Sequence, residues 1–594
     1  MNNIDHIEKV RHSLAHLLAA AVKELYPNAT LGTGPAIEHG FYYDFDFAEP
    51  IADKDLAKIE KKMRELVKKW GAFERKELSE AEAKKAFAHE PYKLELIAEY
   101  AKQGEQLSTY TSGNFTDLCA GPHITSAKEL REVAWKLDRV AGAYWKGSAD
   151  NKMLTRIYGL AFLTKEELET YEKQLAEARA RDHKKLGKEL DLFTFSPLVG
   201  PGLPLWSPKG TLLRNALNDF VWKLRKEKGF VQVTIPHITK RDLYEVSGHW
   251  EKFADDLFKI TTREGKEYAL KPMNCPHHTQ VFARKQYSYK EMPQRYAETT
   301  MVYRDEQSGE LGGLTRVLSI TQDDAHIFCR HNQVRDEFNA IWDLIDTFYK
   351  TFNFKLKVRL SFHDPAHFEK YLGTKEIWAN AEKTLEDIAQ EKKADYFIGV
   401  GEAAMYGPKI DFIAEDSIGR AHQVATVQLD MNLPERFDLY CINEKNEHER
   451  IVMLHCAIMG SIERFSAVLI EHTAGNLPLF ISPVQIKIVP VRETHNTRAK
   501  EIAQMLEDAG YRVDCDTGDS NMGGKIRDAK VNKIPYTVII GDKDISAKKI
   551  TVESRDHGQL GQFKIEQLIE KLQKEMPYSQ SMPVKKSFWK KLFN

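Results

Sequence analysis

Apolar residues near the start of the chain follow the spacing of a helix. They recur at intervals of three and four residues, at Ile7, Val10, Leu14, Leu17, Leu18, Val22 and Leu25. This spacing predicts an amphipathic helix over residues 4–25 that ends before Pro27. Glycine, proline and aromatic residues over 32–47 favour strands, and residues 51–70 again show a helical pattern. Together these elements predict an α+β domain over residues 1–163.

The pattern changes in the middle of the chain. Thr164 and Glu167 form a helix-capping pair at the start of a highly charged stretch with few large apolar residues, which predicts an exposed connecting helix over 164–190. Residues 191–478 mix helical segments with apolar or alternating runs, as is typical of a large domain built on an antiparallel sheet. The runs expected to form strands are 230–235, 356–362, 395–400 and 450–454.

The last part of the chain alternates short strands with helices, which predicts a compact α/β domain over residues 479–576. The expected strands are 485–489, 511–515 and 536–540, and the expected helices are 496–509 and 525–532. Residues 577–594 contain four lysines and no acidic residue. We expect this basic tail to be disordered; contact with a membrane or RNA through Phe588 and Trp589 is the alternative.

Length and charge limit the possible functions. A chain of 594 residues is too long for one hydrophobic core and predicts about three to five domains. With 42% hydrophobic and 29% charged residues, disorder throughout and a collagen-like structure are excluded. The chain has 86 Lys plus Arg against 87 Asp plus Glu, a net charge of −1. Any nucleic acid must therefore be bound by local patches.

The cysteine content and the N-terminus indicate a cellular compartment. Six cysteines form no CxxC pair and are too sparse for a disulfide scaffold. The N-terminus carries charges before a short apolar run and lacks a cleavage signature, and no run reaches about 18 apolar residues. We therefore expect a protein of the reducing cytoplasm that is neither secreted nor membrane-spanning.

Two pairs of residues in the first domain, one of two histidines and one of a cysteine and a histidine, could form a chemical site. His12 and His16 are four residues apart and would share one helix face, and Cys119 and His123 repeat this spacing in CAGPH. Such groups bind zinc or transfer protons. A single histidine on a helix is more often structural, but two such pairs in one domain favour a site.

A second set of possible metal ligands is dispersed along the chain. It consists of Cys275 in KPMNC, His326 in QDDAH and His455 in MLH. Three nitrogen or sulfur ligands with an open fourth position are typical of a zinc ion that handles a substrate, whereas structural zinc usually has four protein ligands. Spacing alone does not connect residues so far apart, so on spacing a structural role is the simpler interpretation.

A third set combines arginines with carboxylates. Its strings are YRDE, with Arg304 and Glu306, then Arg316, then QDD, and much later GSIERF with Arg464. Arginine binds phosphate oxygens, and carboxylates bind magnesium or an ammonium group. The chain lacks GxxxxGK[ST] and GxGxxG, so a P-loop enzyme and a dinucleotide-binding fold are not predicted.

Taken together, the order and separation of these strings resemble the threonyl-tRNA synthetases, which are class II aminoacyl-tRNA synthetases, over about residues 5–575. GFVQVTIPHI resembles the first class-defining motif, which builds a dimer interface. YRDE through TRV resembles the second motif, and GSIERF the third. The resemblance implies a multidomain α+β homodimer with an antiparallel-sheet catalytic domain, an α+β editing domain and a C-terminal α/β anticodon-binding domain.

The resemblance also implies an ATP site. Arg304 and Arg464 would bind the phosphates of ATP, Arg316 would assist, and Glu306 would contact the adenine end. In the activation step, the carboxylate of the amino acid attacks the α-phosphate of ATP. Because both groups are anions, the reaction requires positioning and charge neutralisation. We expect Mg²⁺ to accompany ATP.

Cys275, His326 and His455 fall where the family has its catalytic zinc ligands. An apolar pocket separates threonine from the nearly isosteric valine by only about 100-fold, whereas a metal that binds both the amino group and the hydroxyl rejects valine. The positions that match the family's threonine pocket are Gln322, Asp324, Tyr406 and Gln428, and Lys409 matches a further site residue. Asp324 would accept a hydrogen bond from the hydroxyl group.

Rejection of serine requires a second selection step. Serine lacks one methyl group of threonine, and burial of that group changes the binding free energy by only about 1 kcal/mol. The first cluster resembles the family's editing site, which is thought to work without a metal. The residues implied to hydrolyse mischarged Ser-tRNA(Thr) are His12, His16, Cys119, His123, Lys93 and Asp117.

The segment GGKIRDAKVNKIPYTVIIG resembles the family's anticodon-binding domain. Some of its basic residues would contact tRNA(Thr), with a solvated helix face as the alternative: Lys525, Arg527, Lys530 and Lys533. The small N-terminal domain of many relatives is not found before the editing domain. The second motif also departs from the family pattern, at Gly312, Leu318, Ser319 and Ile320.

The expected function is activation of L-threonine by ATP, transfer to tRNA(Thr) and hydrolysis of Ser-tRNA(Thr). Two alternatives are weaker. A tRNA-binding paralogue without catalysis would have lost Arg304, Arg464 or a zinc ligand, and all of these are present. A free-standing editing hydrolase would explain residues 1–163 and leave 194–575 without a role.

Overall fold

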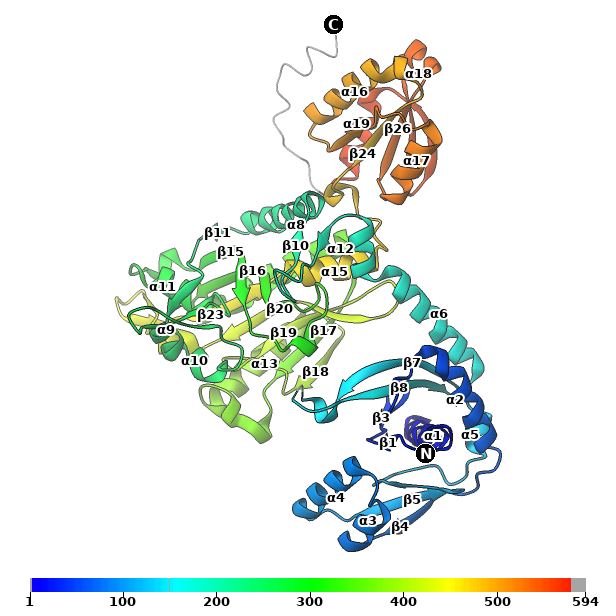
Figure 1. Ribbon diagram of the computed structural model, residues 1–594. Coiled ribbons are helices and arrows are strands. Elements are labelled where there is room, and N and C mark those ends of the chain that lie inside the picture. The colour runs from blue at the N-terminus through cyan, green and yellow to red at the C-terminus, as the bar shows by residue number, and fades with distance from the viewer. Residues whose placement is uncertain (1–2, 149, 578–594) are drawn as a thin grey trace. The chain divides into compact units, whose positions relative to one another are not determined.

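A computed structural model describes residues 3–148 and 150–577 of the chain (Figure 1). The chain divides into two compact units, residues 1–176 and 177–594, and each is described by itself. The predicted basic tail lies outside the described residues from position 578 onward.

Helix α1 (Asn3–Leu25) lies at the centre of the first unit. Val10, Leu14 and Leu17 are fully buried in one core with residues of an antiparallel sheet, as their spacing predicts. The sheet has the order β1-β3-β8-β7, and β2 pairs with β3. Its strands are β1 (Thr30–Leu31), β2 (Ala36–Ile37), β3 (Gly40–Asp46), β7 (Ala134–Tyr144) and β8 (Met153–Phe162). Helix α2 (Asp53–Leu66) packs against α1 and β7.

A smaller sheet completes the first unit. It consists of β4 (Glu74–Glu77), β5 (Ser108–Ser112) and β6 (Phe115–Leu118), with helices α3 (Glu80–Ala86) and α4 (Pro91–Gln103) between β4 and β5. Lys93 lies in the first turn of α4, which begins at a proline. Asp117 lies in β6, and Cys119 follows the end of that strand.

The predicted connecting helix is present as two helices, α6 (Lys165–Arg181) and α7 (His183–Glu189). The backbone amide of Glu167 donates to Thr164 Oγ1 at 3.2 Å, and the Glu167 carboxylate accepts from the Thr164 amide at 3.2 Å. This reciprocal pair is the predicted helix cap. The helix breaks at Asp182, whose side chain accepts from the Lys184 amide at 2.7 Å and caps α7.

An eight-stranded sheet is the framework of the second unit, with the order β11-β15-β16-β23-β20-β19-β17-β18. All neighbouring pairs are antiparallel except the two at the edges, so the predicted antiparallel sheet is confirmed. The strands are β11 (Val231–Gln232), β15 (Gln294–Tyr303), β16 (Ser319–Cys329), β17 (Lys355–Phe362), β18 (Tyr396–Val400), β19 (Lys409–Glu415), β20 (Ala421–Asp430) and β23 (Val452–Ala457).

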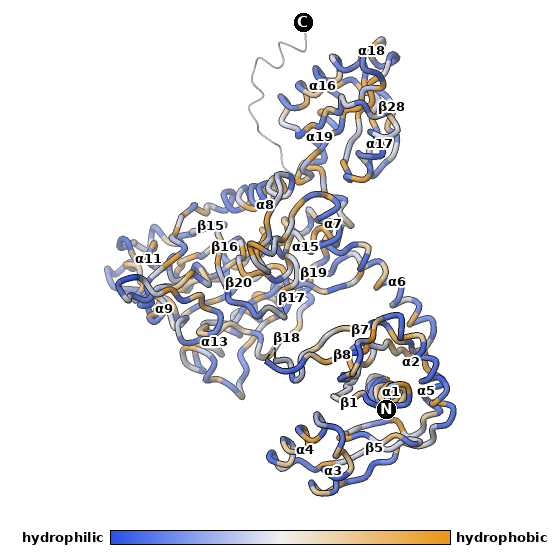
Figure 2. The backbone as a smooth tube through the Cα atoms, viewed as in Figure 1, coloured by the Kyte–Doolittle hydropathy of each residue, from blue (hydrophilic) through white to orange (hydrophobic). Residues whose placement is uncertain are grey.

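Helix α7 and four longer helices share one hydrophobic core with this sheet. The longer helices are α8 (Pro208–Glu227), α12 (Val334–Thr351), α13 (Lys375–Glu391) and α15 (Ile462–His472). Apolar segments are concentrated where these helices meet the strands (Figure 2). A buried ion pair fixes α8 to the sheet, because Arg225 lies 2.5 Å from the Asp323 carboxylate in β16 and both side chains are inaccessible to solvent or nearly so.

One predicted strand is much shorter than expected. Of residues 230–235, only Val231 and Gln232 pair with β15. This segment lies at the sheet edge and leads directly into Pro236, which has no N–H to continue a ladder. The alternating pattern before the proline therefore overestimated the length of the strand.

The last domain is an α/β sandwich, as predicted. Its sheet has the order β25-β24-β26-β27-β28. The strands are β24 (Ile486–Pro490), β25 (Val513–Cys515), β26 (Tyr536–Ile540), β27 (Ile550–Ser554) and β28 (Gly558–Phe563). The helices are α16 (Asn496–Asp508), α17 (Met522–Val531), α18 (Asp542–Ala547) and α19 (Ile565–Lys574). Among the described residues of both units, we find no helix with the length and hydropathy needed to cross a membrane.

Candidate functional site

Three of the predicted metal ligands meet on the large sheet. His326 lies in β16 and His455 in the neighbouring strand β23, and the two are register partners. Cys275 is the first residue of α11 (Cys275–Ala283). One ligand atom from each residue lies within 4.8 Å of the other two, and all three residues are buried. We refer to these three residues as the sheet site.

Each histidine of the sheet site uses one ring nitrogen for a neighbour outside the site. His455 Nε2 lies 2.8 Å from the Asp430 carboxylate, and His326 Nδ1 lies 2.7 Å from His278 Nδ1. The other two nitrogens, His326 Nε2 and His455 Nδ1, lie 3.1 Å apart. A partner on the outer nitrogen fixes the orientation and tautomer of the ring and leaves the inner lone pair for a ligand.

The thiol of the sheet site needs a cation beside it to ionise. Burial raises the pKa of Cys275 well above its ordinary value, and the carboxylates of Asp324 and Asp430 raise it further. One sulfur and two oriented imidazole nitrogens, all buried, fit a zinc ion that keeps its fourth coordination position open.

Residues predicted to bind the amino acid border the sheet site. Asp324 precedes His326 by two residues on β16 and therefore lies on the same face. The ring of Tyr406 stacks on the ring of His455, with centroids 4.8 Å apart. Gln428 is the register partner of His455 in β20. Polar and aromatic groups therefore lie beside the sheet site.

Two further predicted residues lie beyond this group. Gln322 lines a cavity of about 140 Å³ together with Arg464. Lys409 is the register partner of Gln428, but its ammonium lies 3.0 Å from the Asp411 carboxylate. The charge of Lys409 is thus already paired within the sheet.

Three arginines gather beside this cavity. Arg304 follows β15, Arg316 lies in the loop 304–318 that joins β15 to β16, and Arg464 lies in the first turn of α15. Partial desolvation, followed by the charges of Arg304 and Arg316, lowers the pKa of Arg464. Glu306 lies 2.6 Å from Arg316. Arg316 also lies 3.0 Å from the Glu310 carboxylate. Three guanidinium groups against these two carboxylates leave a positive site that suits phosphate.

The four residues of the first predicted cluster also meet. His12 and His16 lie one turn apart on α1, and Cys119 and His123 lie in the loop after β6. Cys119 Sγ is 3.3 Å from both His12 Nε2 and His123 Nε2. One ligand atom from each of the four residues lies within 4.8 Å of the others. We refer to these four residues as the N-terminal site.

The N-terminal site is built from neutral groups. Burial is the main cause that lowers the pKa values of His12, His16 and His123. Burial also raises the pKa of Cys119 to about 11. At neutral pH the imidazoles are therefore uncharged and the thiol is protonated, so the thiol is a poor nucleophile.

A buried ion pair forms part of the wall of the N-terminal site. Lys93 Nζ lies 2.6 Å from Asp117 Oδ1, and the hydroxyl of Tyr43 donates to Asp117 Oδ2 at 2.5 Å. Lys93 and Asp117 line a cavity of about 400 Å³ together with His12, His16 and Cys119. The cavity can hold a small polar group against several fixed donors and acceptors.

Sequence reasoning did not identify all of the residues at these sites. His249 Nε2 lies 3.9 Å from Cys275 Sγ, and burial lowers the pKa of His249 to about 3. His278 and Asp430, which contact His326 and His455, were also missed, as was Tyr43. Asp430 is the last residue of β20, whose apolar and polar residues partly alternate, and it is fully buried. A buried carboxylate needs a partner, and an acidic residue directly after such a pattern is the signal that could have identified it.

Three family models match the chain. They are described as tRNA synthetase class II core domain (G, H, P, S and T), over residues 258–473, anticodon binding domain, over 485–575, and threonyl and alanyl tRNA synthetase second additional domain, over 107–158. A threonine–tRNA ligase of Porphyromonas gingivalis is 46% identical over 95% of this chain and 87% of that protein. Another, of Thermosynechococcus vestitus, is 43% identical over 96% of both chains. The chain belongs to the threonine–tRNA ligase family.

A solved structure supports the membership in the threonine–tRNA ligases. It is described as the RNA binding domain of threonyl-tRNA synthetase from Cryptosporidium parvum and is 36% identical, with a TM-score of 0.64 over 67% of this chain and 99% of that one. The predicted family, the class II fold and the ligase activity are thereby confirmed. The chain is a threonine–tRNA ligase with a class II core, an anticodon-binding domain and an editing domain of the type shared with alanyl-tRNA synthetases.

Proposed function

We propose that the sheet site and the three arginines activate L-threonine with ATP and load tRNA(Thr), and that the N-terminal site hydrolyses Ser-tRNA(Thr). The observation that carries this proposal is the strand register, which brings His326, His455 and Gln428 into one row. Gln322 lies on the same strand as His326 and lines a cavity with Arg464, which supports an anion site close to the proposed amino-acid site.

Cys275, His326 and His455 would hold one Zn²⁺, and when bound it would supply a Lewis acid for the amino and hydroxyl groups of threonine. Valine has no hydroxyl to offer. Asp324 accepts a hydrogen bond from the threonine hydroxyl, and Tyr406, stacked on His455, forms one wall of the pocket. A pocket built to pair a hydroxyl rejects an analogue without it far more strongly than an apolar pocket does.

The three arginines allow the carboxylate of threonine to approach the α-phosphate of ATP, although both groups are anions. Arg304 and Arg464 bind the ATP phosphates, Arg316 assists them, and Glu306 contacts the adenine end. Mg²⁺ accompanies ATP and shares the charge of its phosphates. Their fixed positions lower the barrier for carboxylate attack on the α-phosphate, because neutralisation and orientation are provided before the reaction.

The partner of His455 provides a test of the zinc site. Asp430→Asn removes the carboxylate that orients His455, and we expect zinc affinity to fall by about 10- to 100-fold. The measurement is competition for zinc against a colorimetric chelator, together with the KM for threonine in pyrophosphate exchange. Asp438→Asn is the matched control, because its side chain is 79% exposed. Unchanged zinc retention in Asp430→Asn would contradict the assignment.

At the N-terminal site we propose hydrolysis without a metal. The neutral imidazoles of His12, His16 and His123 can accept a proton from water, and the protonated thiol of Cys119 can donate a hydrogen bond. The Lys93–Asp117 pair is buried and fixed, so it can orient the terminal adenosine or the serine hydroxyl. A site without metal separates the editing reaction from the zinc-dependent one.

Removal of two N-terminal groups tests the editing assignment. We expect His12→Ala combined with Cys119→Ala to leave threonine charging intact while Ser-tRNA(Thr) accumulates, because the water is no longer held. Deacylation of purified Ser-tRNA(Thr) is the measurement, repeated after zinc has been removed, which should not slow it. The matched control is His89→Ala, an exposed histidine of the same unit. Rapid deacylation by the double variant would refute the assignment.

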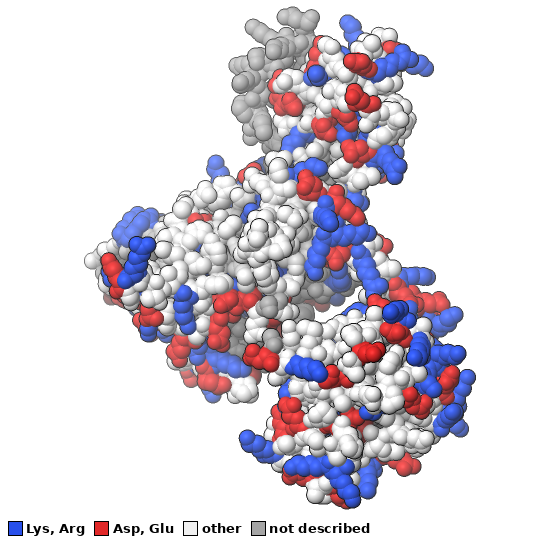
Figure 3. All heavy atoms as spheres, in the orientation of Figure 1, with Lys and Arg blue, Asp and Glu red and all other residues white. Residues whose placement is uncertain are grey.

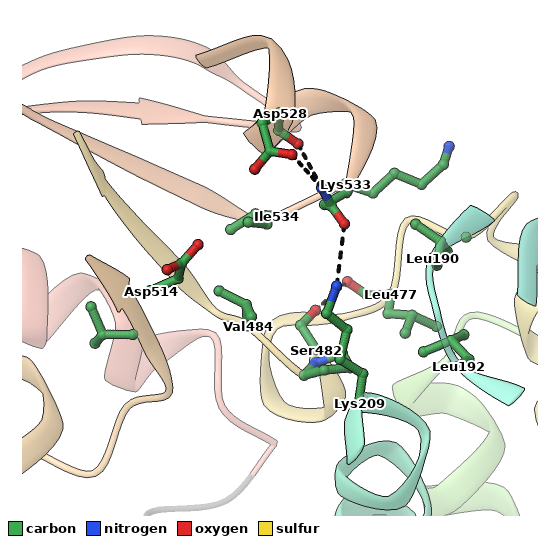
Figure 4. Close-up of a pocket in the computed structure, with 14 residues that line it drawn as sticks. Leu190, Leu192, Lys209, Leu477, Ser482, Val484, Asp514, Asp528, Lys533 and Ile534 are labelled. Atoms are coloured by element: carbon green, nitrogen blue, oxygen red, sulfur yellow. Dashed lines mark hydrogen bonds between the residues drawn. The ribbon is translucent and has the colours of Figure 1, made fainter. Parts of the chain in front are cut away.

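We propose that the last domain binds tRNA(Thr) through a subset of the predicted basic residues. Lys525 is buried and donates to the Asp516 carbonyl at 2.9 Å, so its role is structural. Lys533 lines a cavity of about 620 Å³, across which Lys209 donates to Asn532 at 3.3 Å (Figure 4). Arg527 and Lys530 are both exposed, and Lys530 Nζ lies 3.1 Å from the Glu553 carboxylate. Positive and negative side chains are mixed over this domain (Figure 3), which favours local recognition.

We propose that the protein is a homodimer. Apolar side chains are exposed in the segment before α8, on α8 and in β11: Phe195, Leu198, Val199, Leu205, Leu212 and Val231. Leu198 is 99% exposed. The surface over β15 and β16 carries few charged side chains in the view of Figure 3. Exposed apolar side chains of this kind mark an interaction site, and Val231 lies within the first class-defining motif.

We propose the cytoplasm as the location of the protein. All six cysteines are free, as is typical of a reducing compartment.

Replacing two of the exposed leucines before and on α8 by glutamate tests whether these leucines form the dimer interface. We expect Leu198→Glu combined with Leu212→Glu to produce monomers at micromolar concentration, because charge is depleted at interface cores. Sedimentation velocity is the measurement. Ile545→Glu, at an apolar position in the last domain that is 39% exposed, should remain dimeric. If the double variant sediments like the unaltered protein, the dimer does not use these leucines.

A further inference from the structure

A buried histidine outside the proposed active site contacts the loop 304–318. His183 is the first residue of α7 and is 4% exposed. Its Nε2 lies 3.1 Å from the backbone nitrogen of Leu314, in that loop. Its Nδ1 lies 2.6 Å from the carboxylate of Glu471, in α15. One ring thus joins the loop between β15 and β16 to the helix that carries Arg464.

The partners of the ring fix its tautomer. Glu471 can only accept, so His183 Nδ1 carries the proton, and Nε2 is free to accept from the Leu314 N–H. The backbone N–H of His183 also donates to Glu471 at 3.1 Å, and Arg420 lies 2.6 Å from the second carboxylate oxygen. Asp182, His183 and Glu471 have the composition of a metal site. However, both ring nitrogens of His183 and both carboxylate oxygens of Glu471 already have partners within the protein.

The loop approaches the ring through a glycine. Gly313 has a φ of +60°, and a Cβ at this position would lie 2.4 Å from His183 Nε2. Any other residue would be strained in this conformation and would push the loop away from the ring. Leu314 is fully buried directly after it. The loop is therefore seated on His183 at a position that requires glycine.

The residues that follow this contact belong to the proposed ATP site. The carbonyl of Thr315 accepts a hydrogen bond from Arg464 Nε at 3.0 Å. Arg316 comes next and pairs with Glu306 at 2.6 Å. A shift of the backbone at Leu314 would therefore move the groups that hold Arg464 and Glu306 in place.

We propose that His183, held by Glu471, is a positioning residue for ATP, because it fixes the loop on which the geometry of Arg316 and Arg464 depends. The inference rests on the proposed ATP role of these arginines. His183 touches neither of them and acts through the loop backbone. The connecting segment of the chain thereby contributes to the nucleotide site although it contains none of the class-defining motifs.

Substitution of the ring tests the proposal in the full-length, zinc-loaded enzyme. We expect His183→Ala to raise the KM for ATP about tenfold in threonine-dependent pyrophosphate exchange, because a buried amide loses its acceptor. The KM for threonine and the zinc content should stay within about twofold, since the sheet site is not involved. His183→Gln keeps an acceptor at the end of its side chain, so it should restore the KM for ATP to within about threefold.

A second variant changes the loop side of the contact between His183 and the loop 304–318. Gly313→Ala leaves the His183–Glu471 pair intact but forces the loop off the ring, and it should raise the KM for ATP like His183→Ala. Gly309→Ala is the matched control in the same loop, because no atom lies within 4 Å of a Cβ placed there. Hydrogen exchange of the peptide 304–318 should increase in His183→Ala and Gly313→Ala and stay unchanged in Gly309→Ala.

These outcomes distinguish the inference from the proposed function. If the unaltered enzyme lacks threonine-dependent exchange, the proposed function fails. If exchange is present but Gly313→Ala and the folded His183 variants keep the ordinary KM for ATP, only the inference fails. It also fails if His183→Gln is as impaired as His183→Ala, or if the KM for threonine and the zinc content change in parallel with the KM for ATP, as a general loss of structure would cause.

Discussion

The proposed site for threonine activation depends on one constraint, the pairing register of the central strands of the large sheet. His326 pairs with His455, His455 with Gln428, and Gln428 with Lys409, so one row across four strands carries four of the proposed site residues. Because side chains alternate between the two faces, a slip of one residue in any strand would turn its member of the row away. The buried Arg225–Asp323 pair holds α8 to β16 beside this row, and losing either partner would leave an uncompensated charge in the core.

The two units use burial for opposite purposes. In the first unit, burial lowers the pKa of His12 and raises that of Cys119 to about 11, which leaves neutral groups suited to orienting water. In the second unit, Arg304 follows β15 and Arg464 lies in the first turn of α15, so both keep positive charge near the buried residues of the sheet site. Hydrolysis of an ester needs no strong cation, whereas joining a carboxylate to ATP does. Placing the reactions in separate units lets each environment suit its chemistry.

Local structure and one of the two sites could be predicted from the sequence directly. The period of α1, the cap at Thr164 and the order of elements in the last domain follow from short-range rules. Because His12 and His16 are four residues apart on a predicted helix, the sequence alone predicts that their side chains share one face. The sheet site is different, since His326 and His455 are 129 residues apart and only the resemblance to a family joined them. Asp430 and His183 act through tertiary contacts that no spacing reveals.

The most direct test of the central claim is pyrophosphate exchange by the purified protein, measured separately with threonine, serine, valine, alanine and proline. Coordination of a hydroxyl beside Asp324 predicts strong exchange with threonine, weaker exchange with serine, which the second site must then correct, and background exchange with valine. Equal exchange with threonine and valine would contradict the account of the sheet site. Exchange driven best by alanine or proline would contradict the assigned substrate.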